Sequence, residues 1–450
     1  MMTPVFIAFP DEHIIPIYIS LILLIIFDTL SLYLILKIIS LFSDHIFTLT
    51  ALALCWMINP YIIKNTLNGL ETLISFFFIV LTIYYYMKNE LWKSSKYNNR
   101  SFIVLGIILG FSVLTRIDNG LLAAAVFIST FINYVIIEKN KSKYLKFLFV
   151  TTSSLIIIIL PWILYSLYYT GDIYPVSGKA VRFLSLSNID HSPGLDWYLR
   201  MIQKSIINIF KNNITFISII LFILIIIAFK KKSLSFKKLY NNLQPFNAVL
   251  IFSLLLFLSY TFYIFTYWFF DRYYFPLTLI FILYTFVMID YVLPSFKSNK
   301  TRVVFSLIIF FIIIFTNTLR IGFRDLYFQR ETENSGYSKI GIWTNENFKE
   351  GTIIGSTQTG AIGYFGDKLN VINLDGVVNA ECFEALQKKN LMDYIKSKKI
   401  EFIVGWENNI EFIKRESENF KDGDLIFIKK IEGIKNYGLD WYIYKVDYTN

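Results

Sequence analysis

Charged residues are scarce in this 450-residue sequence. They make up 17% of it, whereas 55% of the residues are hydrophobic and 18% are aromatic. So little charge excludes a disordered chain and leaves too little polar surface for a soluble protein of this size. Twenty glycines and ten prolines are also too few for a collagen. The composition is that of a chain whose solvent is largely lipid.

Cysteine and histidine are rare as well. Cys55 and Cys382 have no C-x-x-C spacing, which excludes a disulfide framework and a zinc-ribbon type of site. The three histidines are far apart in the sequence and suggest no pair of metal ligands. We therefore predict neither a metal site nor a cofactor.

The formal charge of +10 is unevenly distributed. Residues 1–319 contain 25 Lys and Arg against 13 Asp and Glu, whereas residues 320–450 contain 18 against 20. The positive excess thus belongs to the apolar part, so nucleic acid is not a predicted partner. We predict two domains: a transmembrane domain over residues 1–319 and an α/β domain over residues 320–450.

Long apolar stretches in the first domain predict a polytopic α-helical membrane protein in contact with the lipid bilayer. Stretches of roughly 17–25 apolar residues are long enough to span a membrane. About ten are present, near residues 14–36, 46–60, 69–87, 102–115, 120–137, 147–169, 206–229, 246–268, 274–293 and 303–319.

Lysine and arginine crowd alternate connections between these stretches. The basic connections lie at residues 88–100, 139–146, 230–238 and 297–302. By the positive-inside rule these connections are cytoplasmic, so residues 59–68, 115–120, 170–204 and 271–273 face outward. We therefore expect a multi-pass protein of the cell membrane whose C-terminal domain is extracytoplasmic.

From about residue 320 the apolar runs shorten to strand length. Five such runs predict strands, near residues 352–355, 370–374, 402–405, 425–428 and 441–446. One helix is predicted between them, over roughly Glu381–Lys398. About 130 residues suffice for a small core, so this part is expected to be a compact α/β domain outside the membrane.

Several ionisable residues lie on the outward connections, close to the membrane, where each needs an explanation. Glu71 opens the third span, and Arg116 and Asp118 lie between two spans that are otherwise almost uncharged. An ordinary helix N-terminus would account for Glu71, because the helix dipole favours negative charge there. A self-satisfied loop ion pair would account for Arg116 and Asp118. The functional alternative is a site for an anionic ligand.

Three further cations lie on outward connections, where the positive-inside rule disfavours them. Lys179 and Arg182 follow the tyrosine-rich end of the sixth span, and Arg272 lies in Asp271-Arg272-Tyr273-Tyr274. A solvated loop and a snorkelling interfacial arginine are the simpler interpretations. The alternative is that these cations bind phosphate. Together the outward residues predict a cleft for a substrate that is half in lipid, in which a carboxylate activates an incoming hydroxyl.

These segments resemble a known family, the bacterial GT-C-type glycosyltransferases that use polyprenyl-phosphate sugars. This group includes protein mannosyltransferase-like, rhizobial lipopolysaccharide glycosyltransferase-like and mycobacterial terminal arabinofuranosyltransferase-like proteins. The landmarks, spread through most of the chain, are Asn59-Pro60 with Asn68-Gly69-Leu70-Glu71-Thr72, Leu114-Thr115-Arg116-Ile117-Asp118-Asn119-Gly120, Leu160-Pro161-Trp162, Gly171-Asp172-Ile173-Tyr174-Pro175, Asp271-Arg272-Tyr273-Tyr274 and Asn373-Leu374-Asp375-Gly376-Val377-Val378-Asn379.

The resemblance implies transfer of a sugar from a polyprenyl-phosphate donor to a cell-envelope glycan, lipid or protein acceptor on the outer face of the membrane. It implies that Arg116 and Arg272, with Lys179 and Arg182, contact the donor phosphate. Asp118 and Glu71 would orient these cations or the acceptor.

The sequence departs from the family pattern in two places. Ile117 replaces the usual proline, and Asn119 precedes the glycine of the turn. Family members also begin with one further span and an outward loop whose acidic pair supplies the general base. Because the segment from Ile15 resembles the start of the second span, we expect the base upstream of this sequence, or else to be Asp11 or Glu12.

Two other classes of function fit the same features. A lipid-linked saccharide flippase or transporter would need polar groups at mid-depth in the membrane, and Asp28, inside the first span, is the main residue of that kind. A non-catalytic cell-envelope assembly protein is the third possibility.

Overall fold

The computed structural model divides the chain into two compact units, each described here on its own. It describes residues 7–9, 12–42, 45–96, 98–187, 194–229, 243–265, 267–320, 337–436 and 438–449. The helical unit comprises Met1–Phe9, Ile14–Tyr165 and His191–Gly322, and the sheet unit comprises Pro10–His13, Ser166–Asp190 and Phe323–Asn450. The sheet unit thus includes two earlier segments besides the C-terminal part, and the domain boundary at residue 320 stays a prediction.

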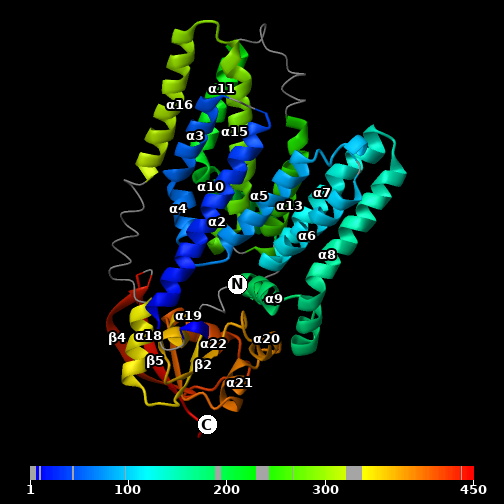
Figure 1. Ribbon diagram of the computed structural model, residues 1–450. Helices are drawn as coiled ribbons and strands as arrows, with labels where there is room; N and C mark the ends of the chain where they lie inside the picture. Colours follow the sequence, from blue (N-terminus) through cyan, green and yellow to red (C-terminus); the bar gives the residue numbers. More distant parts are fainter. Residues whose placement is uncertain are drawn as a thin grey trace. The chain divides into compact units, whose positions relative to one another are not determined.

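The helical unit is built from long apolar helices (Figure 1). Together with shorter helices and the 3-10 turn η2, they are, in chain order, α2 (Ile14–Ser40), α3 (Ile46–Met57), α4 (Pro60–Thr66), α5 (Thr72–Lys88), α6 (Asn99–Thr115), η2 (Ile117–Asn119), α7 (Gly120–Phe131), α8 (Lys141–Thr170), α10 (Leu195–Asn212), α11 (Ile214–Phe229), α13 (Asn247–Ser259), α14 (Phe270–Tyr273), α15 (Thr278–Val292) and α16 (Asn299–Arg320). Two π-helical segments continue α7 and α13, over Ile132–Ile137 and Tyr260–Ile264 respectively.

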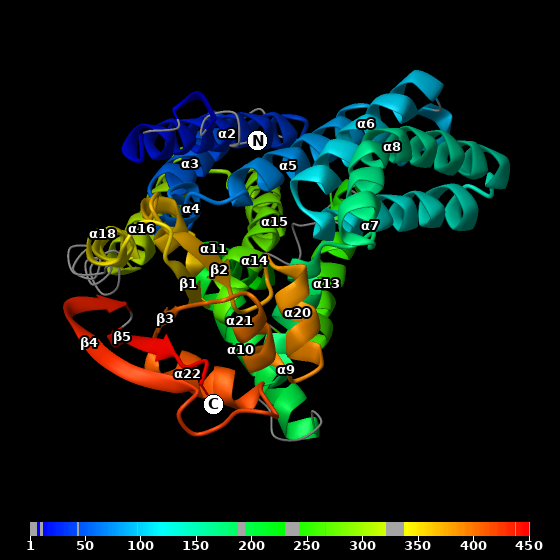
Figure 2. The same cartoon turned by 90° about the horizontal axis from the view of Figure 1, so that it is seen from below.

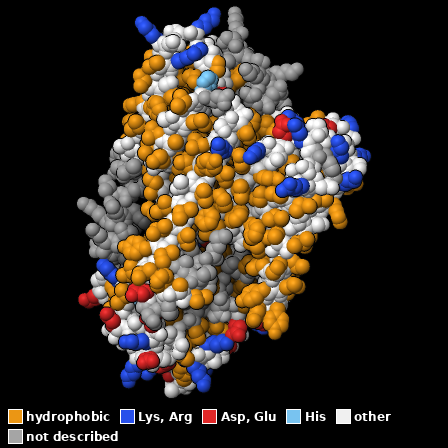
Figure 3. All heavy atoms as spheres, viewed as in Figure 1, with side chains coloured by type: hydrophobic (Ala, Val, Ile, Leu, Met, Phe, Trp, Pro, Cys, Tyr) orange, Lys and Arg blue, Asp and Glu red, His pale blue; other side chains and the backbone are white. Residues whose placement is uncertain are grey.

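The length and composition of these helices are those of a polytopic helical membrane protein. Within the described ranges, six helical segments are long and apolar enough to cross a membrane, or up to eight if each of two bent helix pairs is one span. The helices α5 and α6 are apolar but shorter. Figure 3 shows hydrophobic side chains covering most of the visible helical surface, with Lys and Arg side chains gathered toward its upper end.

Helices meet at sharp bends in two places. The span predicted near residues 46–60 is α3, and the connection predicted over residues 59–68 contains a further helix, α4, which meets α3 at 58°. Asn59 accepts a hydrogen bond from the backbone nitrogen of Tyr61, and Pro60 is the first helical residue, so a new helix begins there. The stretch 206–229 is also not one helix, because α10 and α11 meet at 81°.

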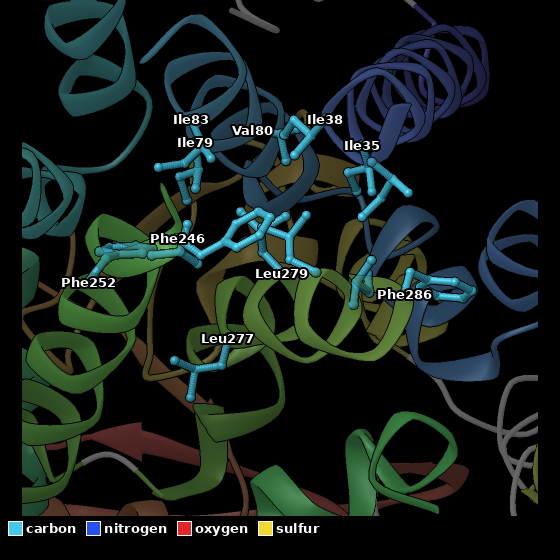
Figure 4. Packing of buried hydrophobic residues seen from close by; sticks show 14 of the residues in the cluster. Ile35, Ile38, Ile79, Val80, Ile83, Phe246, Phe252, Leu277, Leu279 and Phe286 are labelled. Atoms are coloured by element: carbon cyan, nitrogen blue, oxygen red, sulfur yellow. The ribbon is translucent and has the colours of Figure 1, made fainter. Parts of the chain in front are cut away.

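The core of the helical unit lies where α2, α5, α13 and α15 meet (Figure 4). Ile35, Ile79, Phe252 and Phe286 are fully or almost fully buried there. Ten of the 15 residues of α15 are buried, so this helix is central. A helix that is apolar on every side can face lipid on one side and protein on the other.

A pair of glycines brings α6 and α8 together. A Cβ atom at Gly106 would lie 2.4 Å from the carbonyl oxygen of Thr151, and one at Gly110 would lie 2.7 Å from the Cβ atom of Ile158. Such close approach between helices requires small residues, as in the Gly-x-x-x-Gly pattern of membrane helices. This pattern is visible in the sequence but did not enter the prediction of the fold.

The sheet unit contains a five-stranded sheet in the order β2-β1-β3-β5-β4. Its strands are β1 (Ile353–Ser356), β2 (Asn370–Asn373), β3 (Phe402–Gly405), β4 (Leu425–Asn436) and β5 (Leu439–Val446). The first three are parallel, and β5 and β4 complete the sheet as an antiparallel hairpin. All five predicted strands are therefore present, with β4 longer than expected.

Helices cover both faces of this sheet. One core contains Ile354, Val404 and Trp441 of the sheet together with Ile340 of α18 (Tyr337–Asn347) and Ile362 of α19 (Thr359–Phe365). The other core contains Ile403 and Val446 with residues of three helices, namely α20 (Ala380–Gln387), α21 (Leu391–Ser397) and α22 (Glu407–Arg415). Neighbouring residues of β3 thus point into different cores, as the two-residue period of a strand requires.

Two predictions for this unit were wrong. The helix predicted over Glu381–Lys398 is two helices, α20 and α21, because the chain turns at Lys389 with a positive φ of 50°. The expectation of a single helix in this unit was also wrong, because three further helices, α18, α19 and α22, are present among the described residues that follow residue 336.

The outward loop predicted over residues 170–204 is largely helical. It contains α9 (Val176–Ser187) and the first half of α10. Phe183 of α9 packs edge-on against Phe383 of α20, with ring centroids 5.9 Å apart. Figure 2 shows α9 beside α20.

Candidate functional site

Arg116 is at the centre of a polar cluster in the helical unit. It follows the last residue of α6 and has an extended backbone, with φ −155° and ψ 130°. Its Nε and Nη2 atoms each donate to a different oxygen of Asp118, both at 3.0 Å. The two side chains are only 10% and 17% exposed. This is a bidentate pair, the strongest geometry available to an arginine and a carboxylate.

Glu71 joins the cluster from the N-terminal end of α5. Its Oε1 atom accepts from Nη1 of Arg116 at 3.2 Å, and its side chain is 41% exposed. The preceding turn is fixed by Asn68, whose side chain accepts from the backbone nitrogen of Leu70, and by Gly69, whose φ of +70° favours glycine. Of the two carboxylates that pair with Arg116, Glu71 has the more exposed side chain, 41% against 17% for Asp118, so it is the one open to a ligand.

Asn119, one of the departures from the family pattern, holds the turn in place. It is 1% exposed. Its Nδ2 atom donates to Oγ of Ser75 on α5 at 2.8 Å and to the carbonyl oxygen of Ser112 on α6 at 2.9 Å. These bonds fix η2 against both helices, and so fix Asp118, which lies within η2, and Arg116, which directly precedes it.

Two tyrosines complete the cluster: Tyr273, which belongs to the Asp271-Arg272-Tyr273-Tyr274 segment selected from the sequence, and Tyr260, which the sequence did not single out. The hydroxyl group of Tyr260 donates to Asp118 at 2.5 Å and accepts from Nη2 of Arg116 at 3.0 Å. Its ring is stacked on the ring of Tyr273, with centroids 4.6 Å apart and planes 18° apart. Tyr260 begins a π-helical segment, a feature that is frequent at functional sites and could not be foreseen from the apolar pattern.

Arg272 meets Arg116 at the ring of Tyr273. The guanidinium carbons of the two arginines lie 5.0 Å and 5.1 Å from the centroid of that ring. Within the described residues no carboxylate oxygen lies within 4.0 Å of the Arg272 guanidinium, and its buried Nε atom has no hydrogen-bond partner. Its Nη2 atom donates to the Tyr273 hydroxyl group at 3.3 Å. Arg272 thus carries a charge that no carboxylate among the described residues neutralises.

Asp271 anchors the short helix that carries Arg272. Its carboxylate accepts from Nζ of Lys64 at 2.9 Å and from the side-chain amides of Asn208 at 2.6 Å and Asn212 at 3.0 Å. Burial alone would raise the pKa of Asp271, but Lys64 and the two amides outweigh it, so the pKa lies below its ordinary value. Tyr61 also donates to the backbone oxygen of Asp271 at 2.6 Å. Helix α14 is therefore tied to α4 and α10.

The other predicted site residues belong to the sheet unit. Lys179 forms an ion pair with Asp172, and this hydrogen bond lowers the pKa of Asp172. Arg182 is one turn further along α9 and is partly buried. Glu12 is exposed, and Asp11 lies outside the described residues. The structure thus brings together Arg116, Asp118, Glu71 and Arg272, all within one unit.

The formal charges of this cluster cancel. Arg116 and Arg272 contribute two positive charges, and Asp118 and Glu71 contribute two negative charges. Both carboxylates contact Arg116. In the part of the chain that the structure describes, no group of three His, Cys, Asp or Glu side chains could hold a metal ion.

Comparison with known proteins gives one family match. A family model described as Domain of unknown function (DUF8728) matches residues 324–444, which cover most of the C-terminal segment and less than half of the chain. No curated protein matches the chain.

Proposed function

We propose that this protein is a membrane glycosyltransferase of GT-C architecture, which transfers a sugar from a polyprenyl-phosphate donor to a cell-envelope acceptor on the outer face of the membrane. The proposal rests on the family resemblance and on one observation. The guanidinium groups of two arginines lie against the ring of Tyr273: Arg116 is paired with carboxylates, whereas Arg272 is paired with none that the structure describes.

Arg272 is the residue best suited to bind the donor phosphate. Its buried Nε and its remaining N–H groups can donate to a phosphate oxygen, and stacking on Tyr273 and Phe269 holds the guanidinium plane. The leaving phosphate changes from a diester with one negative charge to a monoester with two. A fixed cation beside it therefore stabilises the transition state more than the bound donor.

Arg116 and Asp118 act as positioning residues in this scheme. The N–H groups of Arg116 donate to Asp118, Glu71 and Tyr260, and both oxygens of Asp118 accept from Arg116. An arginine whose N–H groups already donate to protein acceptors has few N–H groups left to donate to a substrate. This assignment changes the expectation from the family resemblance, in which Arg116 itself contacts the phosphate.

Glu71 is the carboxylate of the cluster that can face the acceptor. In the reaction, the acceptor oxygen forms a bond to the anomeric carbon, the bond from that carbon to the phosphate oxygen breaks, and polyprenyl phosphate leaves. The acceptor hydroxyl proton passes to a carboxylate. Glu71, with one oxygen bound to Arg116 and a 41% exposed side chain, is the candidate for this role within the helical unit, and Glu12 and Asp11 stay predictions from the sequence.

Donor binding by the full chain tests the proposal. The chain is reconstituted in lipid nanodiscs, and binding of a radiolabelled polyprenyl-phosphate hexose is measured for the parent, for Arg272→Ala and for Arg302→Ala. Arg302 is a matched control, because it lies on α16 and donates to the backbone oxygen of Phe296. Loss of a charge-assisted contact worth about 1.5–3 kcal/mol should weaken binding roughly 10- to 100-fold in Arg272→Ala. Equal binding by Arg272→Ala and the parent would refute this role.

A flippase of lipid-linked saccharides is the second candidate, because Asp28 lies well inside a predicted span. Asp28 of α2 accepts a hydrogen bond from Nε1 of Trp56 on α3 at 3.0 Å. Intramembrane carboxylates of this kind are frequent on transport pathways. Vesicles given the labelled donor decide between the two. A new glycosidic linkage supports the transferase, and movement of the donor across the bilayer without a new linkage supports the flippase.

A further inference from the structure

The sheet unit has a topological switch point at the carboxyl ends of its parallel strands. The helix after β1, α19, contributes Ile362 to one core, and the helix after β3, α22, contributes Ile410 and Ile413 to the core on the opposite face. The neighbouring strands β1 and β3 are therefore followed by helices that cover opposite faces of the sheet. Ligands of open α/β sheets bind at this place, outside the carboxyl ends of the strands.

The three loops at this edge, hereafter the carboxyl edge, are polar but carry no cation. They comprise residues 356–360 after β1, 373–379 after β2 and 405–409 after β3. Residues 320–450 contain 18 lysines and arginines, yet none is in these loops, whose only charged residues are Asp375 and Glu407. Serine, threonine, asparagine and glutamine supply the remaining polar side chains. An anionic ligand such as a phosphate is therefore disfavoured here.

Aromatic and amide groups meet across the switch point. The hydroxyl group of Tyr337 donates to the side-chain oxygen of Gln358 at 3.3 Å, and the Tyr337 ring lies 6.4 Å from that of Trp406. In the parallel pairing of β1 with β3, Gly355 lies opposite Ile403. Three residues further along each chain, the same register places Gln358 opposite Trp406. A half-exposed aromatic ring beside a planar amide offers both an apolar face and hydrogen-bonding groups.

Oxygen acceptors at this edge are left without donors. Two buried oxygen atoms, Oγ1 of Thr357 and Oδ1 of Asn373, have no hydrogen-bond partner among the described residues. Each of these residues is only 8% exposed. Asp375 is partly buried and forms no ion pair with any described residue. Asp375 accepts from the backbone nitrogen of Val377 at 2.9 Å. Buried acceptors are normally satisfied, so the oxygens of Thr357 and Asn373, which have no donor among the described residues, are the ones that a ligand could satisfy.

We propose that the carboxyl edge binds a neutral saccharide. Sugar hydroxyl groups would donate to Thr357 and to the amides of Gln358 and Asn373, and the apolar face of a sugar ring would pack on Trp406. The absence of cations from the loops excludes recognition of a phosphate group by ion pairing. This inference stands independently of glycosyl transfer, because every residue in it belongs to the sheet unit.

The test uses the full chain in nanodiscs and a panel of neutral oligosaccharides of glucose, mannose and N-acetylglucosamine, two to six units long. Binding is followed by saturation-transfer NMR and calorimetry for the parent, Thr357→Val, Gln358→Ala and the control Thr352→Val. Thr352 is 7% exposed and precedes β1, so the control makes the same chemical change at the opposite end of that strand.

We expect at least one oligosaccharide to bind the parent, and roughly tenfold weaker binding to Thr357→Val and Gln358→Ala with Thr352→Val unchanged. The thermal midpoint of Thr357→Val without ligand should not fall below that of the parent, because its hydroxyl group has no partner to lose. The proposal is overturned if no member of the panel binds, if both edge variants bind like the parent, or if Thr357→Val alone is destabilised. Displacement of the sugar signal by calcium ions or inositol phosphates at the same residues would make the proposed class of ligand wrong.

Discussion

The pair of Arg116 and Asp118 should contribute strongly to stability, and a double-mutant cycle can measure how much. The parent is compared with Arg116→Met, Asp118→Asn and the double variant. Breaking a fully buried pair from one side costs about 3–5 kcal/mol, because the other charge is left uncompensated. Both side chains keep some exposure, 10% and 17%, so we expect about 3 kcal/mol for the larger effect.

The two single variants should not be equivalent. Arg116→Met leaves Asp118 and Glu71 without their shared cation, whereas Asp118→Asn leaves Arg116 bound to Glu71 and Tyr260. Arg116→Met should therefore destabilise more. The double variant should destabilise by less than the sum of the two, with a coupling energy of about 2 kcal/mol.

Unfolding of the purified chain in detergent, followed by circular dichroism against denaturant, provides the assay. Arg272→Met is the control, because no carboxylate among the described residues pairs with Arg272. Its free energy of unfolding should stay within about 1 kcal/mol of the parent. Two results would refute the assignment of Arg116 as a positioning residue and Arg272 as a phosphate-binding residue. One is that the losses in unfolding free energy of the two single variants add up to the loss of the double variant. The other is that Arg272→Met loses as much unfolding free energy as Arg116→Met.

Two further predictions concern packing and burial. Gly106→Ala should destabilise the helical unit by about 1–3 kcal/mol, because its Cβ would lie 2.4 Å from a carbonyl oxygen, whereas Gly120→Ala, with no atom within 4 Å, should be neutral or slightly stabilising in the same melts. In the sheet unit, burial raises the pKa of Asp375, so its charged form opposes folding, and stability falls as the pH rises from the ordinary value of 3.8 through the raised pKa. Asp375→Asn should therefore be more stable than the parent at pH 7, and the difference should vanish at low pH; equal stability at both pH values would contradict this.

The sequence predicted the parts of this protein that depend on local pattern. The five strands follow from short alternating runs, and the apolar helices follow from their composition. Arg116, Asp118, Glu71 and Arg272 could be selected because charge is expensive beside long apolar stretches. Each of these inferences uses residues that are close together in the chain.

Contacts between distant residues could not be predicted in the same way. Tyr260 lies within an apolar stretch, so the sequence suggests only an aromatic residue at the membrane interface. In the structure its hydroxyl group donates a hydrogen bond to Asp118, which is 142 positions earlier in the chain. Lys64, Asn208 and Asn212 likewise converge on Asp271 from two other helices. The break between α20 and α21 was missed because apolar residues on both sides of Lys389 fit one helical face, and a single positive φ interrupts them.

The pairing of charges, more than their presence, decides what each arginine can do. From the sequence, Arg116 and Arg272 are equivalent cations on outward turns. The structure gives the first a set of hydrogen bonds to two carboxylates and a tyrosine, and gives the second a stacked ring and a buried nitrogen without a partner. Because Asp271 fixes α14 through α4 and α10, Arg272 can be held in place without a carboxylate that would neutralise it. An anion would therefore gain more at Arg272 than at Arg116, although Arg116 lies in the more recognisable motif.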